Sequence, residues 1–158
     1  MEKKTAKWAT LIICAVMGIL STVDDVERFS VYIGSPFVNR FYFHFFHVSF
    51  IHYAINAWCL LSIVFSFDTS VKMLLTAFAA ASFVPVCWSF PTVGLSAVCF
   101  VLLGRYAFRV RDKVMYLSCL TMTIAIGFII PNVNGWIHLF CLSEGLIIGF
   151  LNYPLKWK

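Results

Sequence analysis

Four polar side chains, each near the start of an apolar segment, have the types that acyl transfer needs. Ser96 and His138 can act as nucleophile and base, since a serine hydroxyl needs a neighbour to take its proton and histidine is the usual one. His52 and Asn56 are four residues apart, hence on one face of a helix. Together with the backbone N–H of Ser96 they can donate hydrogen bonds to a tetrahedral oxyanion. The sequence therefore predicts a nucleophilic acyl-transfer site if these segments meet.

The composition predicts a polytopic membrane protein. Of the 158 residues, 61% are apolar and 12% are charged, whereas soluble domains average about 45–50% and about 25%. The 17 Phe, 5 Trp and 6 Tyr exclude a disordered chain. The six cysteines lie in or beside apolar runs, which indicates packing rather than a disulfide scaffold. The basic residues lie between apolar segments rather than on one face, which argues against a nucleic-acid partner.

The apolar stretches predict an all-α membrane protein, a bundle of six transmembrane helices in a single domain, 1–158. Several stretches are shorter than the ~20 residues that cross a full hydrocarbon core, which indicates a locally thinned bilayer. No repeat or linker marks a second domain. The predicted spans are 8–23, 44–66, 72–90, 95–110, 114–131 and 136–152.

The basic residues predict that both termini are cytoplasmic, in a multi-pass protein of a cell membrane, most simply a bacterial plasma membrane. An alternative interpretation of 1–23 is a signal peptide, but no small-residue cleavage site precedes Asp24. With the N-terminus inside, the external loops hold only Arg28 and Arg40. The cytoplasmic side then holds Lys3, Lys4, Lys7, Lys72, Arg105, Arg109, Arg111, Lys113, Lys156 and Lys158.

This topology places the four polar residues at one level, in the outer half of the bilayer, because the second, fourth and sixth spans all run inward. Ser96 lies in the first turn of its helix, where free N–H groups and the positive end of the helix dipole meet. Taken singly, each residue also has a structural interpretation: a back-bonded serine, a packed histidine or a His–Asn clamp between helices. Their shared level favours a site.

Small residues on one face of the fourth span and on one face of the sixth predict that these two spans pack closely. They lie at helical spacing on the faces that carry the serine and the histidine. Packing of these faces would bring the serine and the histidine together near the outer surface, with an aromatic ring stacked under the imidazole. The faces consist of Ser96, Phe100 and Gly104 in the fourth span and of His138, Gly145 and Gly149 in the sixth.

The longest connection, 24–43, is predicted to be external. It carries Asp24, Asp25 and Glu27, and an aromatic cluster from Phe41 to Phe46 follows. Mixed charge before aromatic residues is typical of a segment that lies at a membrane interface, although for this segment taken alone an ordinary aromatic belt is the favoured interpretation.

These stretches resemble the rhomboid family of intramembrane serine proteases. The second span reads His47-Val-Ser-Phe-Ile-His52-Tyr-Ala-Ile-Asn56, and the fourth contains Gly94-Leu-Ser96-Ala followed by Phe100 and Gly104. In the sixth, Gly145 follows His138. The order, spacing and sidedness of these motifs resemble the six-span core of the family over nearly the whole chain.

The resemblance implies a serine endopeptidase that hydrolyses peptide bonds in or near transmembrane helices of membrane-protein substrates. It implies a Ser96–His138 dyad without an acid, and an oxyanion hole formed by His52, Asn56 and the Ser96 amide. It also implies that His47 is structural and supports the external loop. The expected partners are single-pass or other transmembrane proteins and the lipid bilayer, and no metal or other cofactor is expected.

Two substitutions leave an alternative open. Ile137 and Cys141 stand where the family usually has Ala and Gly, and larger side chains there would push the sixth span away from the fourth. The alternative is a catalytically inactive rhomboid-like protein that binds or retains transmembrane clients. A small transporter fits less well, because it would need ionisable groups through the full depth of the bilayer, and the inner halves of the spans have almost none.

Overall fold

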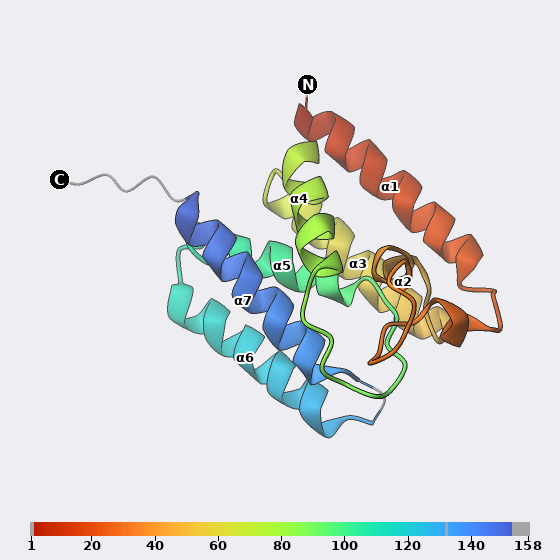
Figure 1. Ribbon diagram of the computed structural model, residues 1–158. Helices are drawn as coiled ribbons and strands as arrows, with labels where there is room; N and C mark the ends of the chain where they lie inside the picture. The colour runs from red at the N-terminus through yellow and green to blue at the C-terminus, as the bar shows by residue number, and fades with distance from the viewer. Residues whose placement is uncertain (1, 132, 153–158) are drawn as a thin grey trace.

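The computed structural model describes residues 2–131 and 133–152, and within them the fold is all-α, as predicted (Figure 1). The described residues contain seven α-helices and no β-strand. The helices are α1 (Glu2–Leu20), α2 (Asn39–Tyr42), α3 (Phe50–Ser66), α4 (Val71–Ser82), α5 (Ser96–Tyr106), α6 (Lys113–Ile129) and α7 (Gly135–Leu151). Two 3₁₀ turns, η1 (Val26–Phe29) and η2 (Phe43–Phe45), lie on either side of α2.

Side-chain caps set where several helices begin. The Ser49 side chain accepts a hydrogen bond from the N–H of His52 at the start of α3, and Asp112 does the same for Met115 at the start of α6. Such caps satisfy N–H groups that have no partner inside the helix. The predicted start of the second span at 44 is therefore wrong, since α3 begins at Phe50.

The third predicted span is also wrong in length, because α4 ends at Ser82 and not near 90. Pro85 follows closely, and a proline disfavours the helical conformation of the residue before it. The chain from 83 to 95 is irregular, apart from a single antiparallel bridge between Val31 and Thr92. This segment and the connection between α1 and α3 lie together beside the start of α5.

Helix α5 is the centre of the fold. Its sequence is apolar on all sides, and eight of its 11 residues are buried, as expected for a helix that has neighbours all round. It packs most extensively against α7, and also against α4 and α3 (Figure 1). At its C-terminal end the Tyr106 hydroxyl, fully buried, lies 2.8 Å from the hydroxyl of Thr69.

The long connection after α1 packs onto the 83–95 segment instead of projecting from the fold. The Trp88 indole donates to the carbonyl of Val31 (3.0 Å), and the Arg40 guanidinium donates to the carbonyl of Val84 (2.8 Å). These bonds fix the two irregular segments to each other on the side of the molecule where Ser96 begins α5.

The expected multi-pass membrane localisation is contradicted by the helix lengths. Among the described residues, no single helix combines the length and apolarity needed to cross a membrane, and only a pair, Asn39–Phe45 with Phe50–Ser66, passes when joined across a 94° bend. Helices of 11 to 17 residues extend only about 17–26 Å, less than a hydrocarbon core of about 30 Å. Helix α1 has 19 residues but four charges in its first six. Lys156 and Lys158, which supported the orientation, lie outside the described residues.

Candidate active site

Ser96 and His138 meet at the N-terminal ends of two packed helices. Ser96 is the first residue of α5, and His138 lies in the first turn of α7. The Nε2 atom of His138 lies 2.9 Å from the Oγ atom of Ser96, within hydrogen-bond distance. The two residues are 42 positions apart in sequence, and the nucleophile–base pair expected for acyl transfer is thus assembled by the packing of α5 on α7.

Three glycines allow this packing. An added Cβ at Gly145 of α7 would overlap the carbonyl oxygen of Val101, and one at Gly104 of α5 would overlap the carbonyl oxygen of Leu142. At Gly149 a Cβ would lie 2.7 Å from the carbonyl oxygen of Arg105. These carbonyl oxygens are backbone atoms and cannot move aside as a side chain can. Only glycine at these three positions allows the two helices to approach so closely.

The His138 ring is held by packing instead of by a carboxylate. The ring of Phe100 stacks on it, with centroids 4.4 Å apart and 24° between the planes. Within the described part of the chain, the Nδ1 atom of His138 is buried without a hydrogen-bond partner. A Cβ on Gly127 of α6 would come within 3.3 Å of that atom, so α6 closes this edge of the ring. Among residues 2–131 and 133–152, no carboxylate is hydrogen-bonded to the ring, so the geometry is that of a dyad.

Burial lowers the pKa of the His138 imidazole from 6.5 to about 4, and nearby His52 adds a smaller contribution in the same direction. Desolvation disfavours the charged form of a histidine, so the ring is neutral at pH 7. A neutral imidazole has a free nitrogen lone pair, which a general base requires.

The reactivity of Ser96 is therefore expected to persist at mildly acidic pH. The base is active when neutral, and its neutral fraction falls as the pH falls through the lowered pKa. The rate of Ser96 modification by a fluorophosphonate is expected to change little between pH 8 and about 6, and to decline below about pH 5. Circular dichroism at each pH separates this loss from unfolding. A midpoint near the ordinary histidine value of about 6.5 would contradict a desolvated base.

His52 and Asn56 lie against the backbone that leads to Ser96. A Cβ on Gly94 would lie 3.0 Å from Nε2 of His52 and 3.7 Å from Nδ2 of Asn56, and the φ of Gly94 is +126°, a conformation that L side chains rarely adopt. The Asn56 amide donates one hydrogen bond to the His52 carbonyl (2.9 Å), which leaves its second N–H for another acceptor. Both predicted oxyanion donors are thus next to the glycine that precedes the serine turn.

His47 holds the same turn from the other side. Its Nε2 atom accepts a hydrogen bond from the N–H of Leu95 (3.4 Å), and the N–H of Gly94 donates to the carbonyl of Phe43 (2.8 Å). The His47 ring also packs edge-on against the His52 ring, with centroids 5.0 Å apart. This placement agrees with the structural role that the resemblance implies for His47.

Two buried side chains connect the segment that leads to Ser96 with the segment that leads to His138. Neither of them was identified as functional from the sequence. Asn134 caps α7 by accepting from the N–H groups of Trp136 and Ile137, and its Nδ2 atom donates to Oγ1 of Thr92 (2.8 Å). Both side chains are buried. Thr92 precedes Ser96 by four residues, and Asn134 precedes the dyad histidine by four. Asparagine before a glycine at a helix start is a recognisable cap signal, whereas nothing in the sequence marks Thr92 as its partner.

Thr92→Val is expected to lower the modification rate of Ser96 by about tenfold, because the isosteric change leaves the buried Asn134 amide without an acceptor. The loss of one buried hydrogen bond costs about 1–3 kcal/mol. We expect part of this cost to lower the stability of the fold, and the other part to misalign Ser96 and His138 and so to slow labelling. Fluorophosphonate labelling rates and denaturant unfolding measure the two parts separately. Thr76→Val is the control, since that hydroxyl only bonds the Lys72 carbonyl within its own helix. Equal labelling rates in both variants would show that the connection does not position the dyad.

The dyad opens on a cavity of about 460 Å³ between α3, α5, α6 and α7. Its lining includes the four predicted catalytic residues together with apolar side chains: Ser96, His138, His52, Asn56, Ile55, Phe100, Leu103 and Leu120. Cavities of this size with a few convergent polar groups are the usual form of a ligand site.

Ile137 and Cys141 do not separate the two helices. Both side chains are buried, with 1% and 0% of their surface exposed, and the Ser96–His138 pair is nevertheless at 2.9 Å. The expectation that these larger residues displace α7 from α5 is wrong, because the close approach is made at the glycines one and two turns further along the helix.

A second serine–histidine pair occurs in the fold without a cavity. His44 Nε2 lies 3.1 Å from Ser82 Oγ, and both residues are buried. The Ser82 hydroxyl already donates to the carbonyl of Phe78 (2.9 Å), and neither residue lines the dyad cavity or the larger cavity next to it. This pair is a packing contact and offers an internal comparison for the dyad.

Comparisons of the chain with protein-family models, curated proteins and solved structures gave no match. The residues of the cavity are therefore the basis for assigning its chemistry. Within the described residues, no group of three or more His, Cys, Asp and Glu side chains is placed to hold a metal ion.

Proposed function

We propose that this protein is a serine endopeptidase with a rhomboid-like helical bundle, which cleaves peptide bonds in or near the transmembrane helices of other proteins. The observation that carries the proposal is the Ser96 Oγ–His138 Nε2 distance of 2.9 Å at a cavity that His52 and Asn56 also line. The order of the motifs along α3, α5 and α7, which resembles the rhomboid family, supports the choice of a peptidase among acyl-transfer enzymes.

The reaction follows from the placement of the groups. Ser96 Oγ attacks the carbonyl carbon of the scissile bond while His138 Nε2 takes its proton. The oxyanion accepts hydrogen bonds from His52, Asn56 and the Ser96 N–H. The C–N bond then breaks, and His138 returns the proton to the leaving amine. Water attacks the acyl ester by the same route, which gives a carboxylic acid and restores the Ser96 hydroxyl.

The walls of the cavity support a long apolar substrate. Helices α3 and α6 both contribute residues to its lining, and in the described structure these two helices do not pack extensively against each other. A helical or partly unwound segment can therefore approach Ser96 between them without displacing the tightly packed α5–α7 pair. Most of the lining is apolar, which favours the side chains of a transmembrane segment.

The proposal is tested by labelling the purified protein with a fluorescent fluorophosphonate, which requires no knowledge of the substrate. We expect the wild type and Ser82→Ala to be labelled, and Ser96→Ala and His138→Ala to remain unlabelled. Peptide mapping of the labelled protein should place the adduct on Ser96. A folded wild type that is not labelled would favour the alternative, a protein that binds transmembrane clients without cleaving them.

A further inference from the structure

A second cavity, of about 640 Å³, adjoins the dyad cavity. The two share four lining residues, Val48, Pro91, Val93 and Val133. The second cavity therefore borders the one that holds Ser96, close enough for a neighbouring residue of a bound peptide to occupy it.

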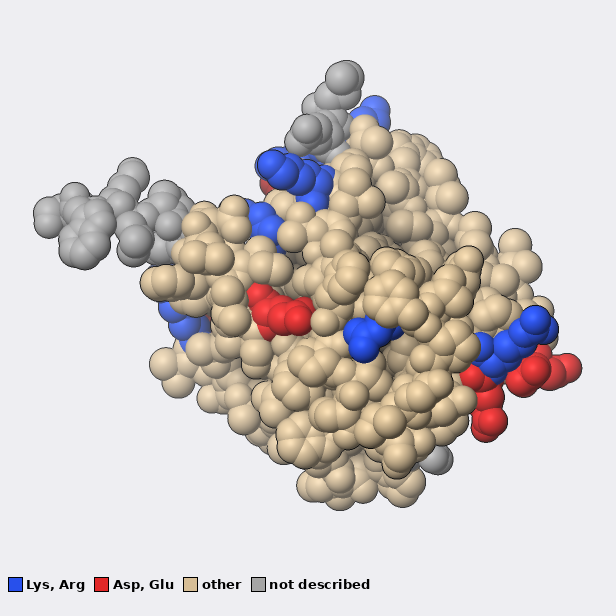
Figure 2. All heavy atoms as spheres, in the orientation of Figure 1, with Lys and Arg blue, Asp and Glu red and all other residues tan. Residues whose placement is uncertain are grey.

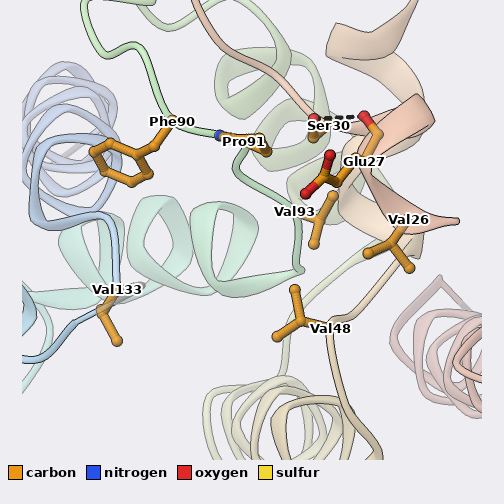
Figure 3. Close-up of a pocket in the computed structure, with 8 residues that line it drawn as sticks. All are labelled: Val26, Glu27, Ser30, Val48, Phe90, Pro91, Val93 and Val133. Carbon is orange, nitrogen blue, oxygen red and sulfur yellow. Dashed lines mark hydrogen bonds between the residues drawn. The ribbon is translucent and has the colours of Figure 1, made fainter. Parts of the chain in front are cut away.

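The second cavity is apolar except at one end. Its other lining residues are Val26, Phe90, Ser30 and Glu27. Figure 3 shows the Glu27 carboxylate pointing into the space beside Val93, whereas the Ser30 hydroxyl is bonded to the Glu27 carbonyl (2.6 Å). Within the described residues, the Glu27 carboxylate has no hydrogen bond or ion pair. The cavity thus has one charged lining residue, and that charge is available to a ligand.

The loop that carries Glu27 is held in place. The Asn39 side chain, buried, donates to the carbonyls of Arg28 (3.0 Å) and Ser30 (2.8 Å). The Phe29 ring stacks on Phe46 with centroids 3.9 Å apart. Glu27 is therefore presented on a segment whose backbone is fixed directly after it, which lowers the entropy lost when a ligand pairs with it.

The surroundings of Glu27 are also negative. Asp24 and Asp25 are exposed on the same loop, and the adjacent Arg28 is the one basic residue among them. Figure 2 shows acidic and basic side chains close together at one edge of the molecule, next to a largely uncharged face. The balance of charge favours a cation at this end of the cavity.

We propose that the second cavity binds a substrate residue that has an apolar stem and a cationic head, a lysine or an arginine, with the head at Glu27. The proposal rests on the proposed function, because the residue belongs to the peptide whose bond Ser96 attacks. Lysine and arginine bury their methylene stems against apolar walls while the charged end stays in a polar environment, which matches a valine-lined cavity that ends at a carboxylate. We expect the ion pair with Glu27 to make a peptide with a cationic residue bind about two- to five-fold more tightly than one with an uncharged residue there, the range for exposed ion pairs.

The test measures binding on the Ser96→Ala protein, which cannot be acylated. Dye-labelled octapeptides of alanine and leucine carry one lysine at each position in turn, and matched peptides carry norleucine there, which keeps the stem and removes the charge. Fluorescence anisotropy gives the dissociation constants. The same series is measured with Glu27→Gln added, and with Asp25→Asn added as the control, since Asp25 has the same charge and does not line the cavity.

We expect lysine to bind two- to five-fold more tightly than norleucine at one position or two neighbouring ones. The preference should disappear with Glu27→Gln, persist with Asp25→Asn and weaken at high salt. Equal affinities at every position, no binding by any peptide, or a preference that survives Glu27→Gln would each overturn the proposal. The dyad is judged separately, by covalent labelling of the wild type, so failure of the one does not imply failure of the other.

Discussion

Ser96→Ala and His138→Ala are each expected to abolish cleavage of a co-expressed single-pass protein whose transmembrane segment carries alanine and glycine residues. Without Ser96 there is no oxygen to form the acyl ester. Without His138 the hydroxyl keeps its proton, because the imidazole nitrogen that lies 2.9 Å from it is the proposed base. An immunoblot for the shortened product measures the loss, and cleavage that persists in either variant would rule out the dyad.

The oxyanion donors should have smaller, graded effects in the same assay. His52→Ala and Asn56→Ala are each expected to slow cleavage by about 10²–10³, the cost of one lost donor. Ser82→Ala should have little effect, although Ser82 also lies beside a histidine, because that pair is closed off from both cavities. A fall with Ser82→Ala as large as with Ser96→Ala would mean that the assay reports folding and not chemistry.

The meeting of Ser96 with His138 was predictable, and the reason is the helical period. A stripe of small residues below each of them fixes which faces of α5 and α7 can approach, and the close approach at Gly104 and Gly145 then brings their first turns together. The stacking of Phe100 on the imidazole follows from the same register. Helical periodicity depends only on residues that are close together in the chain, so it can be recognised in a single sequence.

The irregular segments were not predictable, because their conformation depends on contacts between distant parts of the chain. The bonds from Asn134 to Thr92, from Leu95 to His47 and from Arg40 to the Val84 carbonyl join residues 42 to 48 positions apart. Neither partner of such a bond has a pattern that identifies the other. The helix ends were missed for a related reason, since apolar composition continues past Ser82 although the helix does not.

Membrane localisation was inferred from composition, and composition alone does not give helix length. The chain has the apolar content of a membrane protein, but only part of that content forms the core around α5, where residues such as Leu95, Leu102 and Ile137 are almost wholly buried. Capping residues and prolines divide the apolar stretches into short helices. They are few, so they change the mean hydropathy little, and composition does not reveal where the helices end.

Gly145→Ala is expected to destabilise the fold and disable the dyad together. The added methyl group would overlap the Val101 carbonyl oxygen and lie 3.0 Å from the Val101 Cα. Backbone atoms of a buried helix cannot rotate away, so α7 must move outward from α5. Overpacking of this kind costs about 1–3 kcal/mol, which outweighs the gain of about 0.5–1 kcal/mol from replacing glycine within a helix. Denaturant unfolding measures the balance.

Gly18→Ala provides the matched control, since it adds the same methyl group within a helix but meets only the hydroxyl end of the Tyr53 side chain, 2.8 Å away. Movement of the hydroxyl weakens its hydrogen bond to the Cys14 carbonyl (2.9 Å), a cost of about 0.5–1.5 kcal/mol that the gain of about 0.5–1 kcal/mol from replacing glycine within a helix offsets. We therefore expect a net change in unfolding free energy below about 1 kcal/mol and normal labelling of Ser96. Displacement of α7 should lengthen the Ser96–His138 hydrogen bond, so Gly145→Ala should lose labelling even under conditions where it is fully folded. A Gly145→Ala protein with wild-type stability and labelling would mean that the close packing of α5 and α7 does not hold the dyad together.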